Sequence, residues 1–240
     1  MSSKTKSKSL IITAHPDDES LFFGGLVASV KDVDFELLCM TSGKTEGRAG
    51  ERTQELEEAG KRLGLHSIYH GLLEDLPDQR LNIDKGLEII NRVVGAKSYE
   101  RVYTHGVLGE YGHPHHQDVC YMTHKFFENL IPVMSVAFNI PADMHVILNR
   151  EQFETKAKVV AETYNLESRR FYNLLPISHT EGFSQVSIEE VTELYRFLKG
   201  ESELNDSLID YHQSILPLLK SSPLSELVEN FFKAYFKASN

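Results

Sequence analysis

Short apolar runs rich in β-branched and aromatic residues alternate along this chain with longer segments whose apolar residues recur at helical spacing. The first type predicts strands at residues 9–13, 35–41, 67–69, 101–104 and 133–139. The second predicts helices at residues 20–30, 51–63, 87–94, 116–130, 151–163 and 187–198. Strands that alternate with helices pair in parallel through right-handed crossovers. We therefore expect an α/β fold of the Rossmann-like, doubly wound kind, with a mostly parallel sheet and helices on both faces.

We expect one domain over residues 1–240. No internal repeat or low-complexity linker interrupts the alternation, and 240 residues is an ordinary length for a single α/β domain. Residues 1–8 are polar and basic and are expected to form a flexible N-terminus. Residues 200–240 are expected to form a helical extension with two helices, at 205–220 and 222–240. We interpret this extension as a cap on the sheet, with an oligomer interface as the alternative.

The charge and composition of the chain limit what it binds. The formal net charge is -10 at pH 7, whereas a broad nucleic-acid footprint needs a basic patch or stripe. No apolar run is long enough for a signal-peptide core or a membrane span. Cys39 and Cys120 stand outside any CxxC pair and are expected to be reduced packing groups. These features indicate a cytoplasmic protein that binds neither nucleic acid nor a membrane, and they leave a homo-oligomer open.

Two stretches concentrate side chains that bind metals or move protons. AHPDDES, residues 14–20, follows the first predicted strand, and HGVLGEYGHPHHQD, residues 105–118, follows the fourth. In the doubly wound strand order 3-2-1-4-5 these two strands are neighbours at the point where the winding reverses, and ligands bind there at the carboxyl ends of the strands. We therefore expect a metal site made of His15, one of the two adjacent aspartates and one histidine of the second stretch.

Three protein ligands of this kind leave an open position for water, as in catalytic zinc sites, where the bound water becomes a nucleophile. The remaining aspartate and histidine are suited to act as base and acid. Three other interpretations stay open. Capping the helix that begins near residue 20 could be the sole role of Asp17 or Asp18. Two histidines and a carboxylate also describe a non-haem Fe(II) oxygenase. A non-catalytic sugar-binding protein could retain the same pocket.

Three motifs, in their order, resemble the zinc-dependent N-acetylglucosaminyl deacetylases of the PIG-L and LmbE-like type. AHPDDE at residues 14–19 matches the first family motif in full, and GEYGHPHH at residues 109–116 resembles the second, a short HPxH box. TSGKTEGRAGERTQELEEAGKRLG at residues 41–64 is similar to the Gly-containing loop and following helix of the family. TEGF at residues 180–183 is a weaker similarity. The resemblance implies a Rossmann-like deacetylase that uses Zn²⁺, with Fe²⁺ as the alternative metal in cells.

The resemblance also implies a role for each matched position. His15, Asp18 and His116 would hold the zinc ion, and Asp17 would be the general base. His113 would stabilise or protonate the tetrahedral intermediate.

Two further positions carry implied roles that have plain structural alternatives. Tyr111 would help to polarise the amide oxygen, and Arg52 would meet the polar face of the substrate. Without the resemblance, Tyr111 could be loop packing, and Arg52 could form an ion pair with Glu55 on one helix face.

One position departs from the family pattern. Many members have Asp where this chain has His115, and an anion there would orient and charge the first histidine of the box, His113. We expect the missing support to come from elsewhere, with Asp118 as the candidate.

Together these residues predict a hydrolase that removes the acetyl group from an N-acetylated amino sugar, a GlcNAc-type group on a small conjugate. The rest of the conjugate is set by loops, including residues 139–186, that match no motif.

Overall fold

In the computed structural model, residues 6–43, 48–76, 79–95, 97–169 and 175–221 are described. They form a seven-stranded sheet with the order β3-β2-β1-β4-β5-β7-β6. The strands are β1 (Ser7–Thr13), β2 (Val33–Thr41), β3 (Ser67–Leu73), β4 (Arg101–Thr104), β5 (Val133–Val136), β6 (Met144–Ile147) and β7 (Thr180–Ser184). The first five strands pair in parallel, and β7 runs antiparallel between β5 and β6. The predicted order and the mostly parallel sheet are confirmed.

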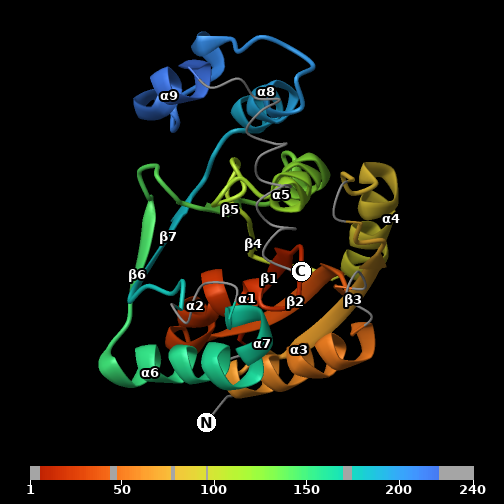
Figure 1. The fold of residues 1–240 in the computed structure, drawn as a ribbon, viewed down its shortest axis with the longest axis vertical. Coiled ribbons are helices and arrows are strands. Elements are labelled where there is room, and N and C mark those ends of the chain that lie inside the picture. Colours follow the sequence, from red (N-terminus) through yellow and green to blue (C-terminus); the bar gives the residue numbers. More distant parts are fainter. Residues whose placement is uncertain (1–5, 44–47, 77–78, 96, 170–174, 222–240) are drawn as a thin grey trace.

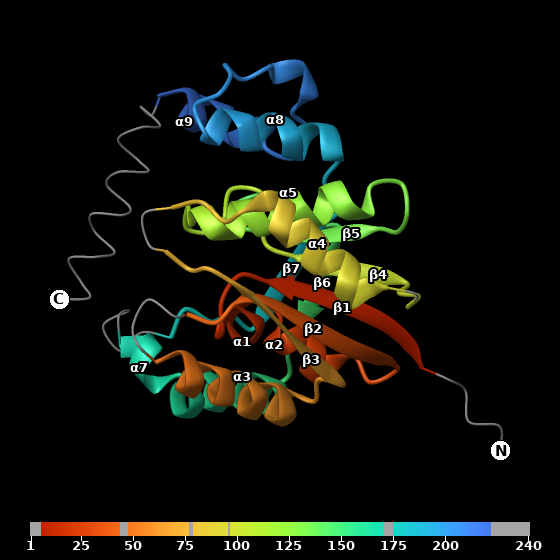
Figure 2. The ribbon, with the colours of Figure 1, turned by 90° about the vertical axis from the view of Figure 1, so that its right-hand side faces the viewer.

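Helices cover both faces of this sheet (Figures 1 and 2). One face carries α1 (Asp18–Phe22), α2 (Gly24–Ser29), α3 (Ala49–Leu63), α6 (Arg150–Lys158) and α7 (Asn165–Ser168). The other carries α4 (Ile83–Val94) and α5 (Pro114–Phe127). In both views α8 (Ile188–Leu198) and α9 (Leu216–Ser221) form an outer layer beyond α5. The molecule is therefore layered as helices, sheet, helices and an outer helical cover.

The two cores follow from the alternation of side chains along a strand. In β1, Leu10 and Ile12 are fully buried on the face covered by α4 and α5, and Ile11 is buried on the opposite face. The central strands carry apolar side chains on both faces, because helices cover both faces of the sheet. This explains why the first predicted strand is a continuous apolar run.

The predicted helix at 20–30 is broken in the structure. Phe23 leaves the helical conformation, with φ of -128° and ψ of -4°, and separates α1 from α2. The Glu181 carboxylate of β7 accepts hydrogen bonds from the backbone N–H groups of Gly25 and Leu26, both at 2.7 Å. A Cβ on Gly25 would lie 2.7 Å from Oε1 of Glu181, so a side chain there would displace this carboxylate. A tertiary contact therefore sets the start of α2.

The region between β5 and α8 differs most from expectation. The predicted strand at 133–139 ends at Val136, and the chain forms two further strands, β6 and β7, that were not predicted. The predicted helix at 151–163 continues from α6 into a π-helical turn at Val159–Thr163. In the edge strand β6 one of four residues, Val146, is buried. An edge strand with one buried side chain lacks the alternating pattern from which strands are predicted.

The two ends of the chain also differ from expectation. β1 begins at Ser7, so residues 7 and 8 belong to the sheet and not to a flexible N-terminus. Residues 205–220 form two 3-10 turns, Asp206–Leu208 and Gln213–Ile215, followed by α9, and not one helix. Pro217 lies in the first turn of α9, where its missing N–H requires no partner. The helix predicted at 222–240 lies outside the described residues.

The described part of the C-terminal extension packs as a cover on α5. Buried apolar side chains of α5, α8 and α9 share one core, which includes Cys120, Leu194 and Leu216. Up to residue 221 the extension therefore covers α5 and not the sheet itself, which differs from the predicted cap on the sheet. Within the described ranges, the helices are too short or too polar to span a bilayer.

Candidate active site

The carboxyl ends of β1 and β4 bring the two polar stretches together. The two strands are adjacent and parallel, so residues 14–18 and 105–116 leave the sheet at the same edge. The backbone N–H of Ala14 donates a hydrogen bond to Nε2 of His105 at 3.0 Å and joins the two stretches directly. The predicted meeting of these stretches, at the point where the strand order reverses, is confirmed.

The Asp18 carboxylate lies at the centre of a buried cluster. Its Oδ2 is 3.5 Å from Nδ1 of His15, and its Oδ1 is 3.3 Å from Nε2 of His116. Oδ2 also accepts a hydrogen bond from the backbone N–H of His15 at 2.8 Å and lies 3.3 Å from Nε2 of His105. Asp18 therefore contacts both of the other residues that the sequence predicts as metal ligands.

A cation suits this cluster. Nε2 of His116 is buried, has no hydrogen-bond partner among the described residues, and faces Asp18. Burial alone lowers the pKa of His116, but the carboxylates of Asp18 and Glu110 outweigh burial and raise it to about 10. Burial lowers the pKa of His15 to about 4, so this ring is neutral at neutral pH and carries a lone pair. The carboxylates therefore favour positive charge here, as a proton on His116 or as a metal ion held by imidazole and carboxylate donors.

His105 and Glu110 also contact the cluster, and the resemblance assigned a role to neither of them. Oε2 of Glu110 lies 2.5 Å from Nδ1 of His116 and 3.2 Å from Nδ1 of His105. A carboxylate that accepts the Nδ1 proton of a histidine fixes the ring and leaves Nε2 for a metal. The sequence signal for His105 is its position directly after a strand. Glu110 carries no such signal, because its position depends on a turn in which it adopts a φ of 50°.

The order His-Pro-His-His places three histidines at the start of α5. Pro114 occupies the first turn, and His113 is the N-cap residue. Nδ1 of His113 accepts a hydrogen bond from the backbone N–H of His115 at 3.2 Å, so Nε2 carries the hydrogen in the neutral ring. Burial, followed by repulsion from His116, holds the pKa of His113 well below its usual range. His113 is therefore a neutral N–H donor stacked on His116, with ring centroids 4.6 Å apart.

Asp17 lies beside the cluster with a different orientation. Its φ is 112°, a conformation that costs about 1 to 3 kcal/mol for a residue other than glycine. Its backbone N–H donates to Oε2 of Glu19 at 3.0 Å, and its Oδ2 lies 3.7 Å from Nη2 of Arg52. The Asp17 side chain makes no capping hydrogen bond to α1. The helix-cap alternative is therefore wrong for Asp17.

Arg52 is buried, and Tyr111 is partly exposed. Arg52 donates to the carbonyl oxygen of Pro16, and its Nη1 forms an ion pair with Oε2 of Glu167 at 3.0 Å. These contacts attach Arg52 to the loop that follows β1 and to α7. Tyr111 is 38% exposed, and its ring lies edge-on to His116 with centroids 5.4 Å apart. Tyr111 therefore lies between the buried cluster and solvent.

Asp118 does not take the expected position. Its Oδ1 accepts hydrogen bonds from Nη1 of Arg80 at 3.0 Å and from the Tyr195 hydroxyl at 2.7 Å. Its Oδ2 accepts one from the backbone N–H of Leu81 at 2.9 Å. The expectation that Asp118 supports His113 is wrong, because these donors engage both carboxylate oxygens and connect α5 to α8 and to the loop before α4.

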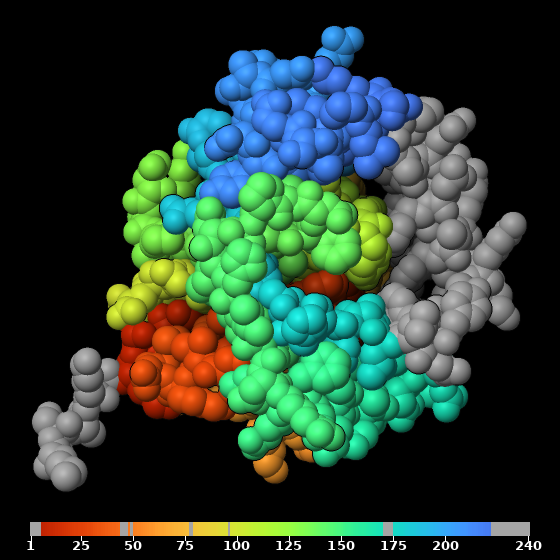
Figure 3. All heavy atoms as spheres, turned by 90° about the vertical axis from the view of Figure 1, so that its left-hand side faces the viewer, coloured from red at the N-terminus to blue at the C-terminus, as the bar shows by residue number. Residues whose placement is uncertain are grey.

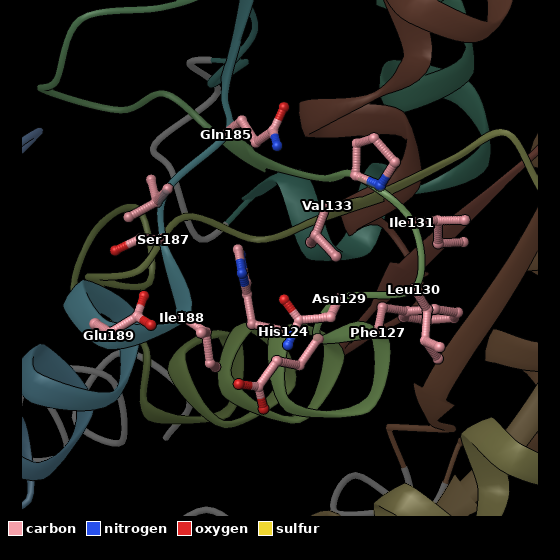
Figure 4. Close-up of a pocket in the computed structure, with 13 residues that line it drawn as sticks. His124, Phe127, Asn129, Leu130, Ile131, Val133, Gln185, Ser187, Ile188 and Glu189 are labelled. Carbon is pink, nitrogen blue, oxygen red and sulfur yellow. The ribbon is translucent and has the colours of Figure 1, made fainter.

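The surface has an opening on the side of β6 and a pocket at the far end of α5. Figure 3 shows the side of the edge strand β6, where red N-terminal residues lie at the bottom of an opening between green and cyan segments. A pocket of about 430 Å³ lies at the other end of α5, and its lining includes His124, Phe127 and Glu189 (Figure 4). Its described lining contains none of the predicted site residues. The polar cluster and this pocket are therefore separate.

Comparison with known proteins identifies relatives for the first half of the chain. Residues 10–127 match the family model described as PIG-L: GlcNAc-PI de-N-acetylase. The N-acetylglucosaminyl-phosphatidylinositol de-N-acetylase of Bos taurus is 29% identical over 117 residues, which cover 46% of each chain. The 1D-myo-inositol 2-acetamido-2-deoxy-alpha-D-glucopyranoside deacetylase of Corynebacterium urealyticum is 29% identical over 160 residues, 51% of this chain and 48% of the relative. The chain thus spans about half the length of these curated relatives.

A solved structure shares the fold over more of the chain. The N,N'-diacetylchitobiose deacetylase from Pyrococcus horikoshii superposes with a TM-score of 0.59, at 18% identity, over 74% of this chain and 83% of that one. The likeness therefore extends beyond residue 127 and confirms the predicted α/β fold class.

Proposed function

Because residues 10–127 form a PIG-L family domain, we propose that this protein is a metal-dependent hydrolase that removes the acetyl group from an N-acetylated amino sugar. The observation that carries this proposal is the cluster of the partly buried His15 with the buried Asp18 and His116, beside the strained Asp17. The names of the relatives describe deacetylation of N-acetylated sugars, which supports a GlcNAc-type group on a small conjugate as the substrate.

In this proposal His15, Asp18 and His116 hold the metal. The donor chemistry supports Zn²⁺, with Fe²⁺ as the alternative in cells, because imidazole and carboxylate ligands accept both. When bound, the ion supplies a Lewis acid that polarises the amide carbonyl and lowers the pKa of water. Glu110 orients His116 through its Nδ1.

Asp17 is the general base of the proposal. Its carboxylate takes a proton from the attacking water, and this proton is then available to the nitrogen of the leaving amine. The hydrogen bond from the Asp17 backbone N–H to Glu19 and the nearby Arg52 guanidinium fix the side chain beside the cluster. The oxygenase alternative uses the H-x-D pair His15 and Asp17 as ligands. Asp18 forms one candidate metal cluster of the described residues, with His105 and His116, and none of these clusters includes Asp17, which argues against that alternative.

His113 and Tyr111 stabilise the negative charge that develops on the amide oxygen. Nε2–H of the neutral His113 is a hydrogen-bond donor, and the Tyr111 hydroxyl is a second donor at the entrance. Arg52 stays a proposed substrate-binding residue, and its buried contacts with Glu167 and Pro16 support a role in holding the loop as well. We place the protein in the cytoplasm, which accords with the two buried free cysteines.

The experiment that tests the function is a measurement of acetate release. The purified protein is incubated with a panel of N-acetylglucosamine conjugates that differ only in the group attached to the sugar, and acetate and free amine are both quantified. The proposal expects stoichiometric acetate and amine for at least one conjugate. The matched control is Asp17→Asn, which replaces the proposed base by a group of the same size. Equal acetate release by this variant would refute the catalytic assignment.

A binding role without catalysis is separated by the same panel. A sugar-binding relative would bind a conjugate and release no acetate, and Asp17→Asn would bind it equally well. A 2-oxoglutarate turnover assay, run in parallel on the iron-loaded protein, separates the oxygenase alternative.

A further inference from the structure

His115 makes contacts that the proposed reaction does not use. It is 2% exposed, and it lies on α5 between His113 and His116. Its Nε2 lies 2.8 Å from the backbone carbonyl oxygen of Gln79. A carbonyl oxygen can only accept a hydrogen bond, so this nitrogen carries a hydrogen. In the neutral ring the other nitrogen, Nδ1, is then an acceptor.

The acceptor nitrogen of His115 faces one of the proposed metal ligands. Its Nδ1 lies 3.0 Å from Nε2 of His15. One of these two nitrogens must donate. When the single hydrogen of the His115 ring is on Nε2, facing Gln79, the donor is Nε2 of His15. The lone pair of the neutral His15 is then on Nδ1, the atom that lies 3.5 Å from Oδ2 of Asp18. The hydrogen-bond network therefore directs the free lone pair of His15 toward the Asp18 carboxylate.

We propose that His115 is a positioning residue that selects the tautomer of His15 in which Nδ1 can bind the metal ion. The chain of contacts runs from the Gln79 carbonyl through His115 to His15. This inference rests on the proposed function, because it takes His15 as a metal ligand. His115 thereby acts on His15, as Glu110 acts on His116. Both imidazole ligands are then oriented by hydrogen bonds at the nitrogen that does not bind the metal.

Besides Asp18, the carboxylate of Asp75 lies beside His15 and His115 in the described structure. Its Oδ1 lies 3.5 Å from Nδ1 of His115 and 4.0 Å from Nε2 of His15. The His115 nitrogen, at 3.0 Å, is thus the closer acceptor for the His15 proton. His15, Asp75 and His115 could instead hold a second cation, because one donor atom from each lies within 4.8 Å of the others. The test below separates this arrangement from the hydrogen-bond network.

The test compares three variants by Zn²⁺ affinity, measured on the metal-stripped full-length protein by competition with a chromogenic chelator. His115→Leu removes the acceptor, and loss of such a partner weakens metal affinity by about 10- to 100-fold. His115→Asn keeps an acceptor oxygen near the position of Nδ1 and is expected to restore affinity to within about threefold of wild type. The control is His124→Leu, which removes a buried histidine of the same helix that contacts Ser135 at 2.8 Å (Figure 4). It should bind Zn²⁺ like wild type.

Other results would overturn the proposal, and each has a distinct meaning. Unchanged affinity in His115→Leu, or affinity in His115→Asn as weak as in His115→Leu, overturns the positioning role alone. Binding of two ions by wild type and of one ion, with unchanged affinity, by His115→Leu shows instead that His115 is itself a ligand. A wild-type protein that binds no Zn²⁺ refutes the proposed function together with this inference.

The tautomer is tested separately from affinity by ¹⁵N chemical shifts of the His15 ring in the Zn²⁺-loaded protein. The proposal expects a protonated Nε2 in wild type and in His115→Asn, and a metal-bound Nδ1. A metal-bound Nε2 in wild type would contradict it. A loss of fold stability does not change which nitrogen of the His15 ring is protonated or which one binds the metal. The ¹⁵N shifts therefore distinguish a positioning role of His115 from a structural role.

Discussion

Two buried charge networks on the same fold are satisfied to different degrees. In the first, Lys156 Nζ forms an ion pair with Oε1 of Glu181 at 2.6 Å, and the carboxylate also accepts from the backbone N–H groups of Gly25 and Leu26. In the second, at the carboxyl ends of β1 and β4, Nε2 of His116 has no hydrogen-bond partner among the described residues. The first network joins β7, α6 and α2, whereas the second surrounds a position at which positive charge is stabilised.

The difference shows how a structural ion pair and a candidate catalytic site can be separated by physical criteria. A buried charge that serves the fold is paired and fully hydrogen-bonded, since an unpaired one is costly. A buried site that retains a ring nitrogen without a hydrogen-bond partner, a strained backbone at Asp17 and strongly shifted pKa values at His116 and His113 carries a cost that the fold alone does not explain. We therefore expect changes in the two networks to affect different properties.

The largest expected effect is that of metal removal. A chelator should abolish acetate release, because the proposed ligands then hold no Lewis acid. The far-ultraviolet circular dichroism should be retained, because two apolar cores cover both faces of the sheet independently of the cluster. Addition of about one equivalent of Zn²⁺ per chain should restore activity. Full activity after complete removal of the metal would contradict the distinction between the two networks. A spectrum that collapses to that of a coil would also contradict it.

A large effect on stability, and not on turnover, is expected from the ion pair between Lys156 and Glu181. Lys156→Met leaves the buried Glu181 carboxylate without its cation, and loss of one partner of a buried pair costs about 3 to 5 kcal/mol of unfolding free energy. The turnover number of the remaining folded protein should stay within about twofold of wild type, because catalytic contacts are unchanged. Urea denaturation and acetate release measure the two quantities. The double variant Lys156→Met/Glu181→Gln should recover part of the stability.

A smaller effect, which depends on pH, is expected at Glu19. Burial raises the pKa of Glu19 to about 7, above its value of about 4.3 in an unfolded chain. The unfolded state therefore loses this proton first as pH rises, and the stability contributed by protonated Glu19 is present below about pH 4 and lost by about pH 7. The loss is about 3 to 4 kcal/mol, from 1.36 kcal/mol per pKa unit.

Glu19→Gln removes this titration and should flatten the fall in stability over the same interval. Urea denaturation of wild type and variant at several pH values measures the difference between the two curves. Parallel curves would show that Glu19 is ionised in the folded protein, like a carboxylate paired with a cation.

The parts of the molecule that could be predicted from the sequence are those that depend on local pattern. The apolar runs at β1 and β4 and the rule for parallel strand ends were enough to bring together His15, one of the two adjacent aspartates and one histidine of the second stretch; the resemblance singled out Asp18 and His116. The individual roles of these residues, and of Asp17, His113, Tyr111 and Arg52, stay proposals that came from the family resemblance.

The parts that could not be predicted depend on contacts distant in the sequence. The break at Phe23 is stabilised by Glu181, more than 150 residues away. Glu110 reaches His116 only because its turn folds back onto the start of α5. Asp118 does not support His113 as expected, because its carboxylate accepts hydrogen bonds from Arg80 and Tyr195, which lie outside every motif.

The central claim is that two adjacent residues of the same type, Asp17 and Asp18, have different roles, and metal content and turnover of Asp17→Asn and Asp18→Ala test it most directly. Asp18→Ala should lose metal and activity together, with partial recovery in excess metal, because Asp18 contacts both His15 and His116. Asp17→Asn should keep near-full metal content and lose turnover by about 10² or more, without recovery. A metal-free Asp17→Asn protein beside a loaded and active Asp18→Ala protein would contradict the assignment.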